Sequence, residues 1–328
     1  MTLKSNKRTF NLKKSGEGKI AVVTGSGGRI GRSLSRALIR GGYEVRAISR
    51  EKEFVKTMPA GVIPYVGDLA DKKVLNEACK GADVMFHLAA VVSEYKSPVQ
   101  ELMDINVKGT TNVLEACRQH SIGDIIFTSS IDVYGRDRKG LITEDTELQP
   151  TDKYGYSKML AEKEIIEYGD KIDYTILRIA TVYGPGFEES YFKVFKAIKE
   201  GKAYIIGAGR NHLSMIHIED VIDGLIMAYE RKKGGKSIYN LSDGVKYTQE
   251  GLFDMIADML KTARPTKHIN PIVVSLVAKN RGLDSDELRF LMSNRVVDIS
   301  RIEKELGYVP SVDIKDAGVD MVRHFLSR

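Results

Sequence analysis

The sequence of 328 residues predicts an α/β fold in which strands and helices alternate to build a parallel sheet. The apolar run IAVVT, which begins at Ile20, is followed by the glycine-rich stretch GSGGRIG and then by a helical pattern. Three more strand-like segments, at 44–49, 62–67 and 83–88, follow at the intervals expected of βαβ units. Parallel strands need such crossover connections, so the order of elements itself indicates the parallel sheet.

The first turn of this pattern has the glycine spacing of a dinucleotide site. Gly25, Gly28 and Gly31 fit T-G-x-x-G-x-x-G, with Thr24 in front. Small residues let the backbone approach a pyrophosphate, and the free N–H groups of the following helix face it. Because an ordinary strand-to-helix turn has similar glycines, the argument depends on the strands that follow.

The periodicity predicts two lobes. We expect a dinucleotide-binding domain at 20–180, with helices near 28–40, 71–80, 99–120 and 154–168. Residues 181–328 are expected to form mainly a smaller, substrate-binding lobe, from which about 215–235 return to the first domain. This lobe should contain a helix near 191–200, a short strand at AYIIG and another at SIYNLS.

The segment YGYSK places a phenol and an ammonium one helical turn apart. Tyr154 and Lys158 are four positions apart, so both side chains lie on one face of the predicted helix. A tyrosine has a reference pKa of ~10, and a fixed cation nearby should lower it toward a useful range. The pair therefore predicts proton transfer, although an exposed helix with the same two residues is common.

Seven motifs in register resemble the extended type of the short-chain dehydrogenase/reductase superfamily, which includes the NAD-dependent epimerases and dehydratases. Within residues 20–241 they are TGSGGRIG, GDLAD at Gly67, HLAA at His87, INVKGT at Ile105, SSIDVYG at Ser129, YGYSK, and LRIATVYGPG at Leu177. The resemblance implies a doubly wound parallel sheet, the Rossmann fold, with a nicotinamide cofactor. It also implies hydride transfer at a secondary alcohol or ketone.

The resemblance also assigns roles to residues. Ser130 would hydrogen-bond the reacting oxygen, Tyr154 would pass the proton, and Lys158 would hold the tyrosine's charge state and bind the nicotinamide ribose. Asp68 and Leu69 would contact adenine. The full set of expected cofactor-binding residues is Gly25, Gly28, Arg29, Ile30, Gly31, Ser49, Arg50, Asp68, Leu69, Leu88, Ala89, Ala90, Asn106, Tyr154, Lys158, Ile179 and Thr181. For the supporting positions, such as Asn106, a purely structural role would explain the residue equally well.

The end of the second strand bears on the choice between NAD and NADP. An NAD site normally has an acidic residue there for the ribose hydroxyls, whereas this chain has Ser49 followed by Arg50. A guanidinium grips a phosphate with a fork of donors, and Arg29 in the glycine loop could assist. We therefore expect NADP(H), with NAD(H) possible if Glu51 takes the ribose.

Absent motifs narrow the substrate class. Sugar-nucleotide members usually carry an arginine four positions before the histidine of a segment such as MIHIED, and that position is Leu213 here. An R-x-G-D pattern is also missing, and dehydratases carry two adjacent acids where this chain has Ile131 and Asp132. The segment NHLSMIHIEDV resembles the branch of hydroxysteroid dehydrogenases and dihydroflavonol-type reductases more than it resembles the sugar-nucleotide enzymes.

These observations predict an NADP(H)-dependent reductase or dehydrogenase. The alternative is a UDP-sugar epimerase with tightly bound NAD. A third alternative is a non-catalytic cofactor sensor, although a sensor would not need the intact set of Ser130, Tyr154 and Lys158.

Composition limits the other classes of function. Most of the net charge of +6 lies in residues 1–19, a basic N-terminal extension, so no nucleic-acid-binding face is indicated. Cys79 and Cys117 are predicted to be small buried hydrophobes of a cytoplasmic protein. The longest apolar run is too short to span a bilayer, and His212 and His217 make no metal pattern.

A homodimer is also expected. In the family, the helices at 99–120 and 154–168 pair with their copies in the partner subunit. Leu102, Ile105, Leu160 and Ile165 offer apolar positions for this contact, although packing against the sheet would explain many of them equally well.

Overall fold

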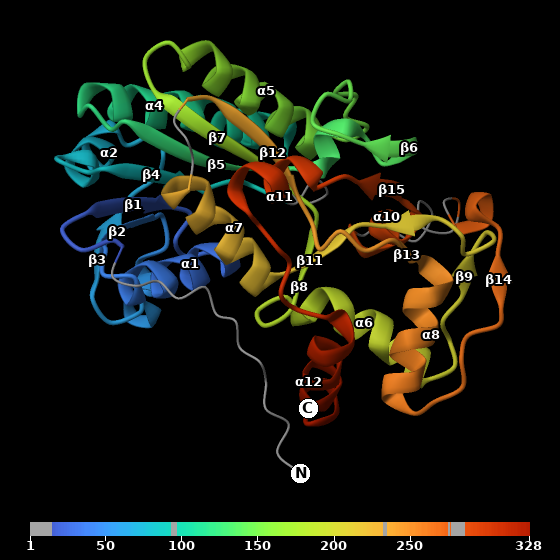
Figure 1. Cartoon of the computed structure of the whole chain (residues 1–328). Helices are drawn as coiled ribbons and strands as arrows, with labels where there is room; N and C mark the ends of the chain where they lie inside the picture. The colour runs from blue at the N-terminus through green and yellow to red at the C-terminus, as the bar shows by residue number, and fades with distance from the viewer. Residues whose placement is uncertain (1–14, 93–96, 232–234, 275, 277–285) are drawn as a thin grey trace.

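The computed structural model describes residues 15–92, 97–231, 235–274, 276 and 286–328. Its centre is a parallel sheet of seven strands in the order β12-β7-β5-β4-β1-β2-β3 (Figure 1). The strands are β1 (Ile20–Thr24), β2 (Glu44–Ser49), β3 (Val62–Val66), β4 (Val84–His87), β5 (Asp124–Ser130), β7 (Asp173–Ile179) and β12 (Ser237–Leu241). The expected doubly wound α/β fold is confirmed.

Helices cover both faces of this sheet because alternate strand residues point to opposite faces. In β1, Ala21 and Val23 belong to the core shared with α1 (Arg29–Arg40) and α7 (Ile218–Glu230), whereas Val22 faces the other layer. That second layer is formed by α2 (Lys72–Cys79), α4 (Gly109–Gln119) and α5 (Lys153–Tyr168) (Figure 1). β1 therefore carries apolar side chains from Ile20 to Val23, as expected of a parallel strand buried on both faces.

The long helix expected at 99–120 is one continuous element with a change of geometry. It begins as α3 (Val99–Leu102), continues as a π-helix over Met103–Lys108 and ends as α4. Periodicity alone does not reveal a π-helix, because the residues on either side keep the helical pattern. The other three helices of the first domain lie within one or two residues of the expected bounds.

The C-terminal lobe packs α6 (Glu188–Lys199), α8 (Gln249–Leu260) and α12 (Ile314–Leu326) around a separate apolar cluster. Short strand pairs complete it, and the strand expected at AYIIG is reduced to two residues. The remaining elements are β8 (Thr181–Tyr183), β9 (Ile205–Ile206), β10 (His212–Leu213), β11 (Met215–His217), β13 (Tyr247–Thr248), β14 (His268–Ile269), α10 (Asp286–Met292), β15 (Asn294–Val297) and α11 (Ser300–Leu306).

The two lobes exchange segments. The strand expected at SIYNLS is β12, which pairs with β7 and forms one edge of the main sheet, so the return extends beyond 215–235. In the other direction β6 (Asp137–Ile142) leaves the first domain and pairs with β15. The boundary near residue 180 stays a prediction.

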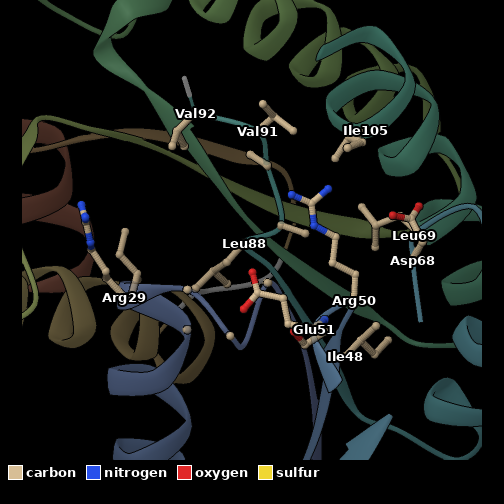
Figure 2. A pocket seen from close by; sticks show the side chains of 18 of the residues that line it. Arg29, Ile48, Arg50, Glu51, Asp68, Leu69, Leu88, Val91, Val92 and Ile105 are labelled. Atoms are coloured by element: carbon tan, nitrogen blue, oxygen red, sulfur yellow. Dashed lines mark hydrogen bonds between the residues drawn. The ribbon is translucent and has the colours of Figure 1, made fainter. Parts of the chain in front are cut away.

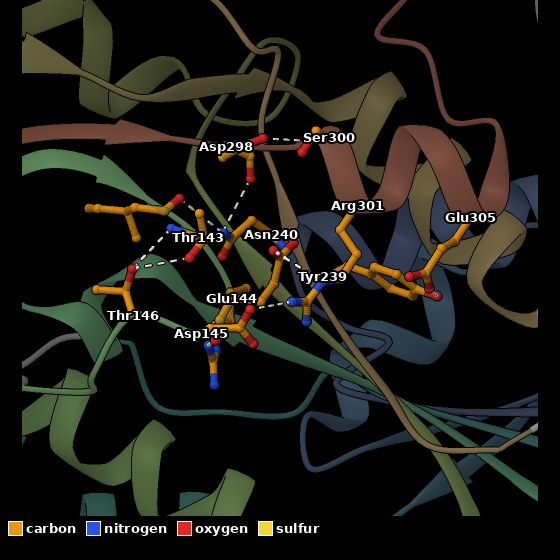
Figure 3. A network of polar contacts seen from close by, with 12 residues as sticks. Thr143, Glu144, Asp145, Thr146, Tyr239, Asn240, Asp298, Ser300, Arg301 and Glu305 are labelled. Atoms are coloured by element: carbon orange, nitrogen blue, oxygen red, sulfur yellow. Dashed lines mark hydrogen bonds and ion pairs between the residues drawn. The ribbon is translucent and has the colours of Figure 1, made fainter.

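A polar network that runs from the buried Glu144 and Asn240 to the exposed Asp145 joins the exchanged segments (Figure 3). The Glu144 carboxylate, just after β6, accepts the backbone N–H of Asn240 in β12 at 2.8 Å. Arg301 of α11 lies against Glu144 at 3.6 Å and donates to Asp145 at 2.7 Å. A loop of the first domain, the edge strand and a C-terminal helix are thus held together.

Two searches cover only the described residues. No helix among them is long and apolar enough to cross a membrane. Within the same part of the chain, no group of three His, Cys, Asp or Glu side chains is arranged to hold a metal ion. Residues 1–14 of the basic extension lie outside the described residues.

Candidate active site

A cavity of about 450 Å³ lies at the carboxyl ends of β1, β2 and β4, the edge where ligands bind in open α/β sheets (Figure 2). Twelve of the expected cofactor-binding residues line it. They are Gly25, Gly28, Arg29, Ile30, Gly31, Ser49, Arg50, Asp68, Leu69, Leu88, Ala89 and Ala90.

The glycine loop fits a pyrophosphate. Gly25 has φ +65°, and a Cβ there would lie 2.7 Å from the backbone of Ala89. A Cβ on Gly31 would collide with the carbonyl oxygen of Gly25, which lets α1 start close against the loop. The first turn of α1 has no side-chain cap and no acidic residue. Its N–H groups and positive dipole end are therefore available to an anion in the cavity.

Two charged residues stand where β2 ends. Arg50 is an exposed side chain whose NH1 lies 3.9 Å from Glu101, and Glu51 lines the same cavity. Figure 2 shows Arg29 on the opposite side of the cavity from Arg50, where it lies 3.4 Å from Glu189. Both arginines line the cavity, and the assistance of Arg29 to Arg50 stays a prediction.

The structure brings Ser130 and Tyr154 together. Ser130 ends β5, and its hydroxyl accepts the backbone N–H of Asp132 at 3.1 Å. The same hydroxyl lies near enough to the Tyr154 phenol to lower the phenol's pKa. Tyr154 lies in the first turn of α5, which Asp152 caps by accepting the N–H of Gly155 at 2.6 Å. A sheet edge and a capped helix thus hold the two hydroxyls at one place.

The pKa of Tyr154 departs from expectation. Burial raises it well above its ordinary value, and the nearby carboxylates Asp132 and Asp152 raise it further. The Ser130 hydroxyl and Arg136 lower it by less. The prediction that the cation of Lys158 would bring the phenol's pKa down is wrong for the protein alone, because desolvation and two carboxylates outweigh it.

The Lys158 amine is buried one turn further along α5. Its Nζ lies 4.0 Å from the ring centroid of Phe127, and burial lowers its pKa to about 7 against the opposing effect of Glu162. His87 is buried nearby, and burial together with Lys158 lowers its pKa to about 3. His87 is therefore neutral, and its ring nitrogens contact the hydroxyls of Thr24 and Thr110 at 2.7 and 2.9 Å.

The other expected residues lie outside the cavity lining. Asn106 is buried in the π-helix and makes two hydrogen bonds to the backbone of Val91, at 2.7 and 3.0 Å, and one to Ser157. It therefore holds a segment that lines the cavity. Ile179 is buried at the end of β7, and Thr181 begins β8, where it pairs with Met215.

Sequence reasoning did not assign a role to Arg136, Asp152 and Arg295, three charged residues near Ser130 and Tyr154. Arg136 donates to Asp152 at 2.7 Å, and Arg295 of β15 donates to Asp132 at the same distance. Arg295 lies more than a hundred residues from Asp132 in the chain, and the pairing of β15 with β6 brings the two together. No local sequence pattern therefore reveals this contact. Phe187, which follows the YGPG motif, also lines the cavity and was missed.

Comparison with known proteins identifies the family. The sequence model of the NAD dependent epimerase/dehydratase family matches residues 21–242. The chain belongs to this family. It is therefore an enzyme, either an oxidoreductase or an epimerase, of a family that depends on a nicotinamide cofactor.

Individual relatives differ in their reactions. One relative is the N-acetyl-α-D-glucosaminyl-diphospho-ditrans,octacis-undecaprenol 4-epimerase of Escherichia coli O157:H7. It is 30% identical over 63% of each chain. A ketoreductase of Stigmatella aurantiaca, for a farnesyl-dihydroquinoline-1-oxide, is 26% identical over 92% of this chain and 95% of its own. The structure of UDP-glucuronic acid 4-epimerase from Bacillus cereus with NAD superposes with a TM-score of 0.77. It is 23% identical and covers 93% of this chain and 99% of its own, which shows the shared fold.

Proposed function

We propose that the chain is an NADP(H)-preferring oxidoreductase that interconverts a ketone and a secondary alcohol. The observation that carries the proposal is that Ser130 at the end of β5 and Tyr154 at the start of α5 lie near each other, at the sheet edge that also forms the dinucleotide-sized cavity. The substrate would be a ketone of the kind handled by the hydroxysteroid dehydrogenase and dihydroflavonol reductase branch.

Each of the three residues has a distinct task. The nicotinamide, when bound, supplies or accepts the hydride. Ser130 donates a hydrogen bond to the substrate oxygen, and Tyr154 gives that oxygen a proton during reduction or takes it during oxidation. Lys158, buried on the same face of α5, holds the charge state of this region and binds the nicotinamide ribose.

The electrostatics of Tyr154 set the protonation state of the phenol in the protein alone. Its raised pKa keeps the phenol protonated at neutral pH, and a protonated phenol is the form that donates to a carbonyl oxygen. The same phenol must accept the proton when the alcohol is oxidised, so this protonation state does not determine the direction of the reaction.

The cofactor preference depends on Arg50. Its guanidinium is 58% exposed and borders the cavity at the end of β2, where the adenosine 2′ position falls in this fold. A planar fork of donors suits a phosphate, and Glu51 next to it would instead suit the two ribose hydroxyls of NAD. We favour NADP(H) because no acidic residue occupies position 49 itself.

A UDP-sugar epimerase is the second candidate. The 30% identity over 63% of the chain to a 4-epimerase of an undecaprenol-diphosphate-linked sugar supports epimerase chemistry. Against it, the position expected to carry a pyrophosphate-binding arginine is Leu213, which is fully buried in β10. Leu213 can neither contact nor neutralise a phosphate.

The deciding experiment measures both reactions on the purified protein. Oxidation of NADPH and of NADH is followed with a panel of steroid-like, aryl and β-keto substrates, and UDP-glucose and UDP-N-acetylglucosamine are tested for epimerisation. We expect NADPH consumption with at least one ketone. Stoichiometric NAD released on denaturation, together with epimerisation, would replace the reductase by the epimerase.

Tyr154→Phe provides the test of the mechanism, with Tyr156→Phe as the matched control on the same helix. Tyr156 is exposed and two residues away, so its variant should keep the wild-type rate. Loss of the positioned acid should lower turnover by ~100 to 10,000-fold while the fold and the cofactor affinity remain. A near-normal rate in Tyr154→Phe removes this residue from the mechanism.

A further inference from the structure

Arg295 occupies an irregular step of the strand pair that joins the two lobes. β15 and β6 pair in parallel, and their register shifts between Asn294 and Val296. Such an irregularity turns a side chain away from its regular direction. The Arg295 side chain is 3% exposed, and its NH1 donates to Oδ1 of Asp132 at 2.7 Å.

The backbone around Arg295 is fixed to the C-terminal lobe. The Ser214 hydroxyl donates to the carbonyl oxygen of Arg295 at 2.9 Å. The N–H of His212 in β10 donates to the side chain of Asn294 at 2.9 Å. The position of the guanidinium therefore follows the position of this lobe.

The carboxylate that receives Arg295 belongs to the Ser130 loop. The N–H of Asp132 binds the Ser130 hydroxyl, and Oδ2 of Asp132 lies 3.6 Å from Arg136. Arg136 in turn binds Asp152, the cap of the helix that carries Tyr154. A chain of alternating charges thus runs from the C-terminal lobe to both hydroxyls of the acid/base pair.

This arrangement is costly if its only task is stability. Nε of Arg295 is buried and has no hydrogen-bond partner among the described residues. An unpaired buried donor lowers the stability of the fold, and it does so more when the group is charged. Buried ion pairs are also often no better for stability than apolar side chains of the same size. The cost points to a task in the site.

We propose that Arg295 is a positioning residue that, through Asp132, fixes the Ser130 loop against Tyr154 and so couples the C-terminal lobe to the acid/base pair. The inference rests on the proposed function of Ser130 and Tyr154. Arg295 does not touch the reacting atoms. It sets the distance and direction between the two hydroxyls.

The first test compares Arg295→Met and Arg295→Lys with Arg301→Met. Arg301 is the matched control because it also joins the C-terminal region to the first domain, through Asp145 at 2.7 Å. A misplaced catalytic group costs on the order of 100-fold, so Arg295→Met should lower kcat by roughly tenfold to a hundredfold. KM and the cofactor Kd should stay within about twofold. Arg295→Lys should keep part of the kcat that Arg295→Met loses. Arg301→Met should have the kcat of the wild type.

A double-mutant cycle with Asp132→Asn tests whether Arg295 acts through that carboxylate. Once Asp132 is neutral, removing the arginine should change kcat by less than about twofold, since interacting residues are not additive. Additive losses overturn the proposal. Equal losses of kcat in Arg295→Met and Arg301→Met, with matching losses of melting temperature, assign Arg295 a purely structural role and overturn it as well.

Hydrogen exchange of the protein without substrate separates this inference from the proposed function. Amides of residues 129–136 should exchange faster in Arg295→Met than in wild type, and should be unchanged in Arg301→Met. Unchanged exchange at 129–136 overturns the coupling. If no ketone is reduced by the wild type while this exchange rises in Arg295→Met, the proposed function fails and the mechanical coupling stands.

Discussion

Arg50 and Glu51 decide the cofactor at the scale of single residues. Arg50→Ala should weaken NADP(H) by about tenfold or somewhat more and leave NAD(H) nearly unchanged, because a charged hydrogen bond is worth ~1.5–3 kcal/mol. Glu51→Gln is the complementary variant, and it should spare NADP(H). Calorimetry with both cofactors measures this without any substrate. Equal affinity of the wild type for the two cofactors would contradict the assignment.

Asp223 of α7 makes stability depend on pH. Burial, and next the charges of Asp220 and Glu219, raise its pKa from 3.8 to about 6. The folded protein therefore binds this proton more tightly than the unfolded chain, so ionising Asp223 destabilises the fold. The penalty is fully present above about pH 6 and disappears as the pH falls toward 3.8.

Asp223→Asn should accordingly raise the melting temperature at pH 7.5 by a few degrees, and the gain should shrink toward pH 4. Glu77→Gln, at an exposed position of α2, should leave the melting temperature unchanged. Thermal unfolding of the three proteins across this pH range gives the comparison. A gain that is constant with pH would rule out the titration of Asp223 as its cause.

At the scale of elements, the outer faces of α3 and α5 bear on the expected homodimer. The sequence named Leu102 and Ile165 as possible dimer contacts. Both are fully buried within the chain and cannot contact a partner subunit. Val99, Tyr156 and Ile166 instead present exposed apolar surface on these helices. The dimer stays a prediction, and we expect its contact to include these residues together with the half-buried Ile105 and Leu160.

Ile166→Glu should convert the dimer to a monomer, because burying an unpaired carboxylate in the contact is costly. Val319→Glu, a similarly exposed position on α12, should remain dimeric. Light scattering at micromolar concentration separates the two outcomes. A monomeric wild type would exclude the dimer.

The sequence predicted elements well where local spacing determines them. The motifs place Gly25, Gly31, Ser130 and Tyr154 at strand ends and helix starts, and the structure has them there. Properties that depend on distant neighbours were not predictable. The pKa of Tyr154 depends on Asp132 and Asp152 together, and the partner of Arg295 depends on a strand pairing far along the chain.

For the whole molecule, the completeness of the sheet depends on residues far from the dinucleotide-binding motifs. β12 covers the edge of β7, and α7 covers the apolar side of α1. A fragment ending at Ala180 lacks both. It should bind a hydrophobic dye and aggregate, because an open strand edge and an apolar face remain exposed.

A fragment ending at Asp243, which keeps α7 and β12, should be better folded and bind the cofactor more tightly than the shorter one. Size-exclusion chromatography, dye fluorescence and calorimetry compare the pair. A monomeric fragment ending at Ala180 with a cooperative unfolding transition and wild-type cofactor affinity would contradict the role of β12 and α7.

The position of β12 also affects how the protein is made. A ribosome adds about 5–20 residues per second, so the strands up to β7 emerge several seconds before β12 can pair with them. During that interval the nascent chain offers a free strand edge to other chains. The nascent chain should therefore need chaperones most while residues 181–241 are being translated. Slow codons in that stretch should lower the yield of folded enzyme.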